Sequence, residues 1–227
     1  MHGLTIYTSN RMEVLAGDLA RIVKMPLLSP LEQEVIVVQS RGMERWLSME
    51  IARHNGICAN CKFPFPNTFL SAIYEKVLPE MASPSLFEPA AMTFNIMALL
   101  PALVERAGFE GLKAYLSDDK KGLKLFQLSE KIADTFDQYL VFRPEMIFAW
   151  EAGRAAHWQA QLWRAVSDAN GKIHRARLHR MLIEKIKTTP DNVAETVHFP
   201  RRVSVFGISY LPLFYIEAFS DDQKAFC

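Results

Sequence analysis

The stretch that most constrains the fold is a short apolar strand followed by a polar turn and a helix. Four β-branched residues, Val35–Val38, form a continuous apolar run, which is typical of a strand buried on both faces of a parallel sheet. From Met43 onward the apolar residues recur at helical spacing. A strand, turn and helix of this kind place the turn at the carboxyl edge of an open α/β sheet, where ligands usually bind.

The turn carries side chains suited to binding rather than to acid–base catalysis. It presents an amide, a hydroxyl and two guanidiniums, those of Gln39, Ser40, Arg41 and Arg45. Such groups form hydrogen bonds with phosphates and with base edges. The turn is therefore a candidate contact for nucleic acid.

The same plan is predicted at the beginning of the sequence. Leu4–Tyr7 is predicted as a first strand, Thr8–Asn10 as capping residues, and a helix is predicted from Met12. Two successive strand–helix units favour a parallel, right-handed, doubly wound sheet.

The middle of the chain is predicted to be helical. Asn67 and Thr68 are expected to cap one helix, and no convincing strand follows between about Ala90 and Thr189. Further helices are predicted over Met92–Ala107, Lys124–Phe142, Pro144–Trp150, Trp158–Ala169 and Arg175–Ile186. Pro101 is expected to kink or split the first of these. Because a strand pattern returns at Arg202–Phe206, with a helical tail after it, we interpret the chain as an α/β domain interrupted by a helical insertion.

Composition narrows the class of protein. Half of the 227 residues are hydrophobic and the formal net charge is +1, so we expect a globular chain whose nucleic-acid binding, if any, depends on local patches. We find neither a signal peptide nor an apolar run of the ~20 residues that span a bilayer, so no membrane partner is expected. The three cysteines fit a reducing cytoplasm better than a disulfide framework.

Nucleotide-hydrolysing motifs are missing from the positions where this layout would place them. The turn at Thr8–Arg11 has no glycine and no lysine, and Gly171-Lys172 is followed by Ile173 instead of a hydroxyl residue. The strand ending at Phe206 is followed by no acidic pair for Mg²⁺. Because these groups supply nearly all of phosphoryl-transfer catalysis, we expect no ATP hydrolysis.

Cys58 and Cys61 form a C-x-x-C pattern, with His54 four residues upstream. A zinc or iron–sulfur site needs a fourth ligand, and none lies at a recognisable spacing. Two buried thiols are therefore the favoured interpretation, and no metal or cofactor is expected.

Two charged groups have alternative interpretations. Asp134 and Asp137 share a helix face without a third carboxylate or a lysine, which favours an exposed charged face over a nuclease metal site. His174–Arg180 and Arg201–Arg202 are basic clusters. They are either solvated helix faces or, with the arginines of the first turn, the electrostatic floor of a nucleic-acid channel.

Longer stretches of the sequence resemble a known family. VIVVQSRGMERWL, FPFPNTFL, KLFQLSEKIADTFDQYLVFRP and VFGISYLP resemble the N-terminal portion of the RecC family, the gamma chains of exodeoxyribonuclease V (RecBCD). The similarity extends from Leu4 to about Phe219. The resemblance implies an α/β fold of the P-loop NTPase, superfamily 1 helicase type that has lost its ATPase motifs. Domain 1A would comprise residues 1–88 and 197–227, and residues 89–196 would form an all-helical insertion, domain 1B.

The resemblance also implies a non-catalytic DNA-binding subunit in double-strand-break repair by homologous recombination. Such a subunit, with RecB-like and RecD-like partners, splits forked duplex DNA and scans single-stranded DNA for a Chi-like sequence. The scanning residues implied are Gln39, Arg41, Arg45, Phe65, Ser71, Asp134, Thr135, Asp137, Arg143 and Arg175. Five of them differ in type from the family's best-known pattern, namely Arg41, Arg45, Phe65, Ser71 and Thr135, so the DNA sequence recognised stays open.

Two other functions fit the sequence less well. An active ATP-driven motor or nuclease is disfavoured by the missing lysine and acidic pair. A scaffold that docks the RecB-like motor without touching DNA is disfavoured by the guanidinium and amide groups at the carboxyl edge of the sheet.

Overall fold

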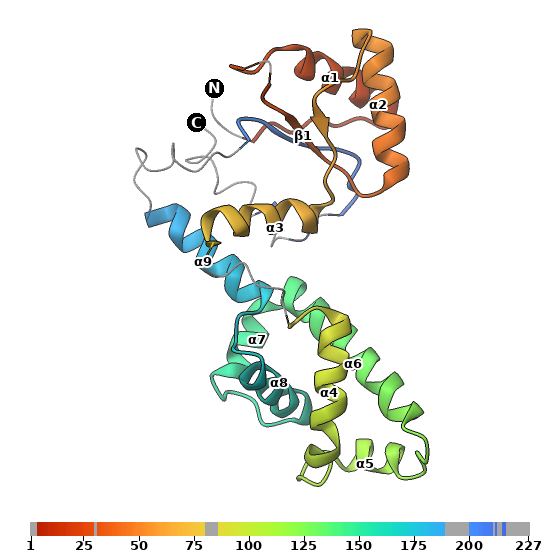
Figure 1. The fold of residues 1–227 in the computed structure, drawn as a ribbon, viewed down its shortest axis with the longest axis vertical. Helices are drawn as coiled ribbons and strands as arrows, with labels where there is room; N and C mark the ends of the chain where they lie inside the picture. Colours follow the sequence, from red (N-terminus) through yellow and green to blue (C-terminus); the bar gives the residue numbers. More distant parts are fainter. Residues whose placement is uncertain are drawn as a thin grey trace. The chain divides into compact units, whose positions relative to one another are not determined.

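The computed structural model describes residues 4–29, 31–79, 86–188, 200–210, 212, 215 and 216, without the side chains of residues 186 and 187. Within these residues the chain is mostly helical and contains a small, three-stranded parallel sheet (Figure 1). The chain divides into two compact units. One comprises Met1–Pro79 and Leu182–Cys227, and the other comprises Glu80–Met181.

The sheet joins segments that are far apart in the sequence. The strands β1 (Glu34–Val37), β2 (Cys61–Lys62) and β3 (Val203–Val205) pair in parallel in the order β2-β1-β3. Val35 lies opposite Lys62 on one side and opposite Val203 on the other. The strands predicted at Val35 and Val203 are thus confirmed. The two-residue strand β2 was not predicted, because it is too short to show a pattern of its own.

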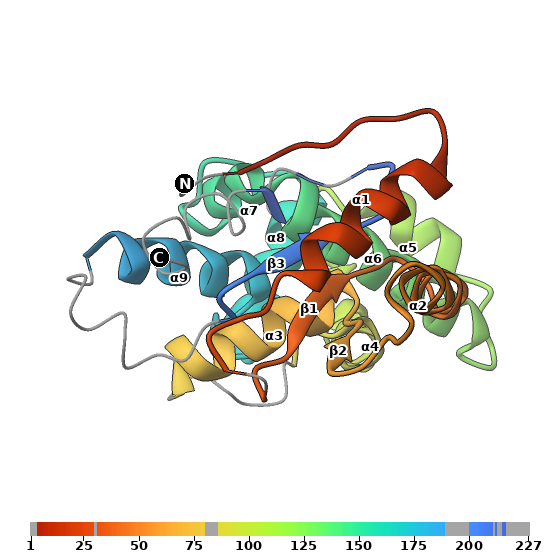
Figure 2. The same cartoon turned by 90° about the horizontal axis from the view of Figure 1, so that it is seen from above.

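Strand β1 is buried on both faces, as its unbroken apolar run predicts. Helices α1 (Met12–Lys24) and α2 (Arg41–Asn55) pack against each other on one side of the strands, and α3 (Pro66–Val77) lies on the other side (Figures 1 and 2). The core on the α1–α2 side consists of Ala16, Leu19, Ala20, Ile36, Val38, Leu47, Ile51 and Phe206. Alternate residues of β1 therefore serve opposite faces of the sheet.

The strand predicted at Leu4–Tyr7 is wrong for this structure, because these residues form no strand and their apolar side chains are exposed. An apolar run of four residues has little preference of its own, and strand structure requires a hydrogen-bonded neighbour. The cap predicted at Thr8–Asn10 is also wrong. Arg11 is the N-cap of α1, and the Ser9 hydroxyl accepts a hydrogen bond from the backbone N–H of Arg11.

The ends of α2 and α3 follow from local chemistry. The Ser40 hydroxyl caps α2 by accepting a hydrogen bond from the Met43 backbone N–H at 3.1 Å. Helix α3 begins at Pro66, before the predicted caps Asn67 and Thr68. Because proline has no N–H group, the first position of this helix needs no capping acceptor.

The second unit is built from helices, and the helical segments predicted there are confirmed. The helices are α4 (Pro89–Leu103), α5 (Glu110–Leu116), α6 (Leu123–Phe142), α7 (Pro144–Glu151), α8 (Trp158–Ala169) and α9 (Arg175–Thr188), the last beginning in this unit. Helix α4 includes Pro101 but ends two residues later, short of the predicted Ala107. Helix α5 was not predicted.

The core of the helical unit is aromatic and aliphatic. Helix α4 packs against α6 and α8, and α7 packs against α6 and α8. Trp163 is fully buried and meets Phe136 edge-on, with ring centroids 5.3 Å apart. Of the helices that the structure describes in either unit, none is both long and apolar enough to cross a bilayer.

The turn after β3 passes close to the beginning of α1 and α2. Gly207 has a φ angle of +65°, and a Cβ added to it would lie 2.9 Å from Met43 Cε and 3.3 Å from Met12 Cε. Two methionine side chains therefore fill the carboxyl edge of the sheet beside β3.

Candidate nucleic-acid interface

The turn between β1 and α2 carries Gln39 and Arg41, and Arg41 contacts the predicted site residue Phe65. Gln39 is exposed directly after the strand. Arg41 Nη1 donates to Glu44 Oε2 at 2.8 Å, and its guanidinium lies 5.3 Å from the centroid of the Phe65 ring. The Arg41 side chain is 79% exposed, so these contacts orient it without burying it.

Arg45 differs from Arg41 in having no carboxylate partner among the described residues. It is exposed on α2, one turn after Arg41. Ser71 is exposed on α3, and in the described part of the chain it shares no hydrogen bond with the turn. Gln39 and Arg45 are therefore the groups of this first set that are freest to bind a ligand.

The second set lies on α6 and at its end, in the helical unit. Asp134 is exposed, and the Thr135 hydroxyl donates to the Lys131 carbonyl oxygen at 2.8 Å. Arg143 is exposed between α6 and α7, with no ion-pair partner among the described residues. The ten predicted residues thus form two sets, one in each unit.

Asp137 and Arg175 are brought together, as an ion pair. Arg175 Nη2 lies 3.2 Å from Asp137 Oδ1, and the two side chains are 21% and 23% exposed. Burial raises the pKa of Asp137, Arg175 opposes the rise, and Glu88 and Asp134 add to it. Both groups are therefore engaged with each other rather than directed into solvent.

The basic cluster His174–Arg180 contains arginines that are partly exposed and are also paired with acids. Its arginines pair with carboxylates of the preceding helices: Arg175 with Asp137, Arg177 with Glu151, and Arg180 with Glu145. Arg201 and Arg202 likewise pair with Glu32 and Glu34. Carboxylates distant in the sequence thus offset the positive charge of these arginines, and the electrostatic floor stays a prediction.

Glu151 is the centre of this ion-pair network, and no motif in the sequence marks it. Its Oε1 accepts hydrogen bonds from Ser167 Oγ at 2.8 Å, His174 Nε2 at 3.0 Å and Trp163 Nε1 at 3.3 Å, and its Oε2 accepts one from Arg177 at 2.7 Å. Burial alone would raise the pKa of Glu151, but His174, Ser167 and Arg177 lower it to about 2. The carboxylate therefore ties α7, α8 and α9 together in its charged form.

His174, the first residue of the cluster, is fully buried. Its Nδ1 accepts a hydrogen bond from the Arg177 backbone N–H at 3.3 Å, which leaves Nε2 to donate to Glu151. Both ring nitrogens of His174 therefore have hydrogen-bond partners inside the helical unit. This histidine is a structural group rather than a ligand for DNA.

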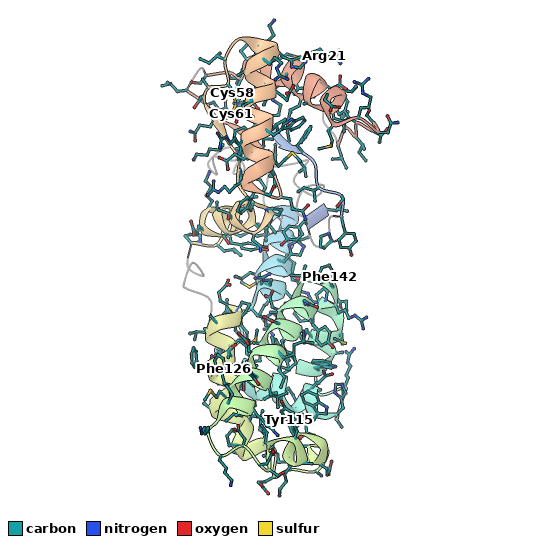
Figure 3. All side chains as sticks on the ribbon, turned by 90° about the vertical axis from the view of Figure 1, so that its right-hand side faces the viewer. Arg21, Cys58, Cys61, Tyr115, Phe126 and Phe142 are labelled. Atoms are coloured by element: carbon teal, nitrogen blue, oxygen red, sulfur yellow. The ribbon has the colours of Figure 1, made fainter. Side chains whose placement is uncertain are left out.

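Cys58 and Cys61 lie together beside the end of α2 (Figure 3) and are half-buried free thiols, not fully buried as predicted. Burial, followed by the neighbouring Cys58, raises the pKa of Cys61 to about 12. His54 Nδ1 instead lies 2.9 Å from the Glu50 carbonyl oxygen. Within the described residues, no three His, Cys, Asp or Glu side chains are grouped to hold a metal ion.

Comparison with known proteins identifies the family. Residues 4–224 match the family described as RecC, N-terminal domain. The chain is 41% identical to the RecBCD enzyme subunit RecC of Escherichia coli K12 over 95% of its length, and 37% identical to that of Haemophilus influenzae over 93%. It covers 20% and 21% of those two relatives, so it spans about a fifth of their length. The chain therefore belongs to the RecC family and corresponds to its N-terminal domain.

Proposed function

We propose that this chain is the N-terminal part of a non-catalytic subunit of a RecBCD-type complex, with RecB-like and RecD-like partners. In that complex it takes part in double-strand-break repair by homologous recombination. The observation that carries this proposal is the family match over residues 4–224. The relatives that the chain matches are named as RecC subunits of the RecBCD enzyme.

The proposal includes contact with DNA: the subunit splits forked duplex and scans a single strand for a Chi-like sequence. Two exposed sets of side chains support it. One contains Gln39 and Arg45 at the carboxyl edge of the sheet, and the other contains Asp134 and Arg143 on the helical unit. Amide and carboxylate groups match base edges, and unpaired guanidiniums match phosphates.

The proposed architecture is that of a superfamily 1 helicase without its ATPase motifs. Domain 1A would be residues 1–88 with 197–227, and domain 1B residues 89–196. The parallel pairing of β3 with β1 across the helical segment supports this division. The turn at Thr8–Arg11, without glycine or lysine, supports the loss of nucleotide chemistry.

A scaffold that binds the RecB-like motor without touching DNA is the second candidate. It is favoured by the ion pairs that occupy several candidate arginines, above all Arg175 with Asp137 and Arg177 with Glu151. The two candidates differ in what the unpaired arginines do.

Binding of single-stranded DNA by the full-length protein in its three-subunit complex distinguishes them. If DNA contacts this chain, Arg45→Ala and Arg143→Ala should each weaken binding on all sequences and lower the salt slope by about one unit at most. Arg180→Ala serves as a control, because this arginine is paired with Glu145 at 3.1 Å. If both exposed arginines can be replaced without changing affinity or salt slope, the scaffold is the better description.

A further inference from the structure

The exposed face of α6 extends from Asp134 to the C-terminal end of the helix. Side chains four positions apart lie on the same side of a helix, so Asp134, Gln138 and Phe142 form one row. Asp134 and Gln138 are exposed, and Phe142 is 51% exposed although it is a large apolar residue. The row ends next to Arg143, the residue that joins α6 to α7.

The opposite side of α6 packs against the rest of the helical unit. Phe136 and Leu140 are fully buried in the core of the helical unit. Asp137 faces Arg175 and holds the end of α9. Asp137 is thus a supporting group behind the row, and from Asp134 to the end of α6 the exposed side chains are those of the row.

The chemistry of the row changes along the helix. Asp134 offers only acceptors, Gln138 offers both donors and acceptors, Phe142 offers an aromatic ring and Arg143 offers only donors with a positive charge. A carboxylate repels phosphates but accepts hydrogen bonds from base amino groups. A nucleic acid on this face is therefore oriented with its phosphate at Arg143 and its base edges toward Gln138 and Asp134.

The exposed ring of Phe142 suits one form of nucleic acid better than another. Bases of a single strand expose their flat faces and stack on aromatic side chains, whereas bases inside a duplex are already stacked on each other. Figure 3 shows Phe142 at one end of the helical unit, with Tyr115 at the other. An exposed phenyl ring beside an unpaired guanidinium thus matches a base and its phosphate in single-stranded DNA.

We propose that Gln138 and Phe142 form a single-strand contact site with Arg143, in which Phe142 stacks on a base and Gln138 reads the edge of a neighbouring base. This inference rests on the proposed function, since it names two further residues that contact the strand. It assigns Asp137 to support and discrimination to Gln138.

Phe142 is tested in the full-length protein within its complex, using single strands that carry 5-iododeoxyuridine. Irradiation should crosslink a base to Phe142, as mapped by mass spectrometry. Phe142→Ala should weaken binding about fivefold or more, and Phe142→Tyr should restore it, because a phenol ring also stacks. Phe94→Ala is the matched control: Phe94 is 64% exposed in the same unit and contacts Phe126, which lies roughly 24 Å along α6 from Phe142.

Gln138 is tested by sequence preference. Gln138→Ala should change the relative affinity for single strands of different sequence about fivefold or more, with little change on a homopolymer. Gln127→Ala is the matched control, since Gln127 is an exposed amide on the same side of α6 about three turns earlier.

The outcomes separate this inference from the proposed function. If Phe142→Ala behaves like Phe94→Ala and Gln138→Ala behaves like Gln127→Ala, while Arg45→Ala still weakens binding, this site is wrong and the DNA-binding function stands. If no variant of either unit alters single-strand binding and no crosslink forms, the proposed DNA contact itself fails. A Phe142→Tyr protein that is folded, shown by an unchanged melting temperature, and does not bind also refutes stacking.

Discussion

Two arginine-rich regions of the molecule look alike in sequence and differ in structure. At the turn after β1, the guanidinium of Arg45 is exposed and without a carboxylate partner in the described residues. At the beginning of α9, by contrast, Arg175 and Arg177 each meet a carboxylate from another helix. The number of arginines in a segment therefore gives its positive charge. The electrostatic potential at the surface also depends on the carboxylates that the fold places beside those arginines.

The largest expected effect concerns Glu151, on which the neutralised region depends. Glu151→Ala leaves the donors of Ser167, His174 and Arg177 without their common acceptor in a largely buried place, which should reduce the free energy of unfolding by about 3–5 kcal/mol. Urea unfolding followed by tryptophan fluorescence measures this loss. Glu145→Ala should cost less than about 1 kcal/mol, because the Glu145 side chain is 84% exposed. Equal losses for the two variants would remove the distinction between a buried network and a surface pair.

The pH dependence of stability tests the same carboxylate without deleting it. The pKa of Glu151 is lowered from 4.5 to about 2, so its stabilisation is complete above about pH 4.5 and is lost as the pH falls toward 2. The loss amounts to about 3 kcal/mol at most. Glu151→Gln should show a flatter stability curve between pH 5 and pH 2. Asp137 contributes with the opposite sign: because its pKa is raised, its protonation at low pH favours the folded state.

The smallest expected effect is the loss of stability when a single arginine is replaced, and it should differ between a paired arginine and an unpaired one. Arg175→Ala leaves Asp137 partly buried without its counter-charge, which should cost about 1–2 kcal/mol of unfolding free energy. Arg143→Ala should change stability by less than about 0.5 kcal/mol, because Arg143 is exposed. Thermal melts of both variants and of the exchange Arg175→Asp with Asp137→Arg give the comparison. No recovery in the exchanged protein would argue against a direct ion pair.

Much of the fold could be predicted because local patterns determine it. The buried strand at Val35, the stripe of α6 and the turn after β1 follow from apolar spacing and from the Ser40 cap. Leu4–Tyr7 and β2 could not be predicted correctly, since a strand of two to four residues is decided by its neighbour across the sheet.

The sequence allowed individual residues of the candidate site to be named, but it did not predict which of them are exposed and which are paired with each other. Sequence spacing places Asp134 and Asp137 on neighbouring positions of one helix, yet the structure exposes the first and pairs the second with Arg175. Glu151 had no recognisable motif, because its four donors come from two other segments, α8 and the beginning of α9. Ion pairs between residues that are far apart in the sequence depend on how the helices pack, so a local sequence pattern cannot predict them.

The close approach of Gly207 to the methionines has a consequence for how this turn can evolve. A side chain at position 207 meets two obstacles of unequal weight: a left-handed backbone conformation that costs about 1–2 kcal/mol, and the Met43 methyl group 2.9 Å away, which is the far end of a flexible side chain and can move aside. Shortening Met43 removes only the second obstacle. The backbone conformation therefore favours glycine at position 207 whichever residue stands at position 43, and a substitution at 207 stays strained even after Met43 is shortened.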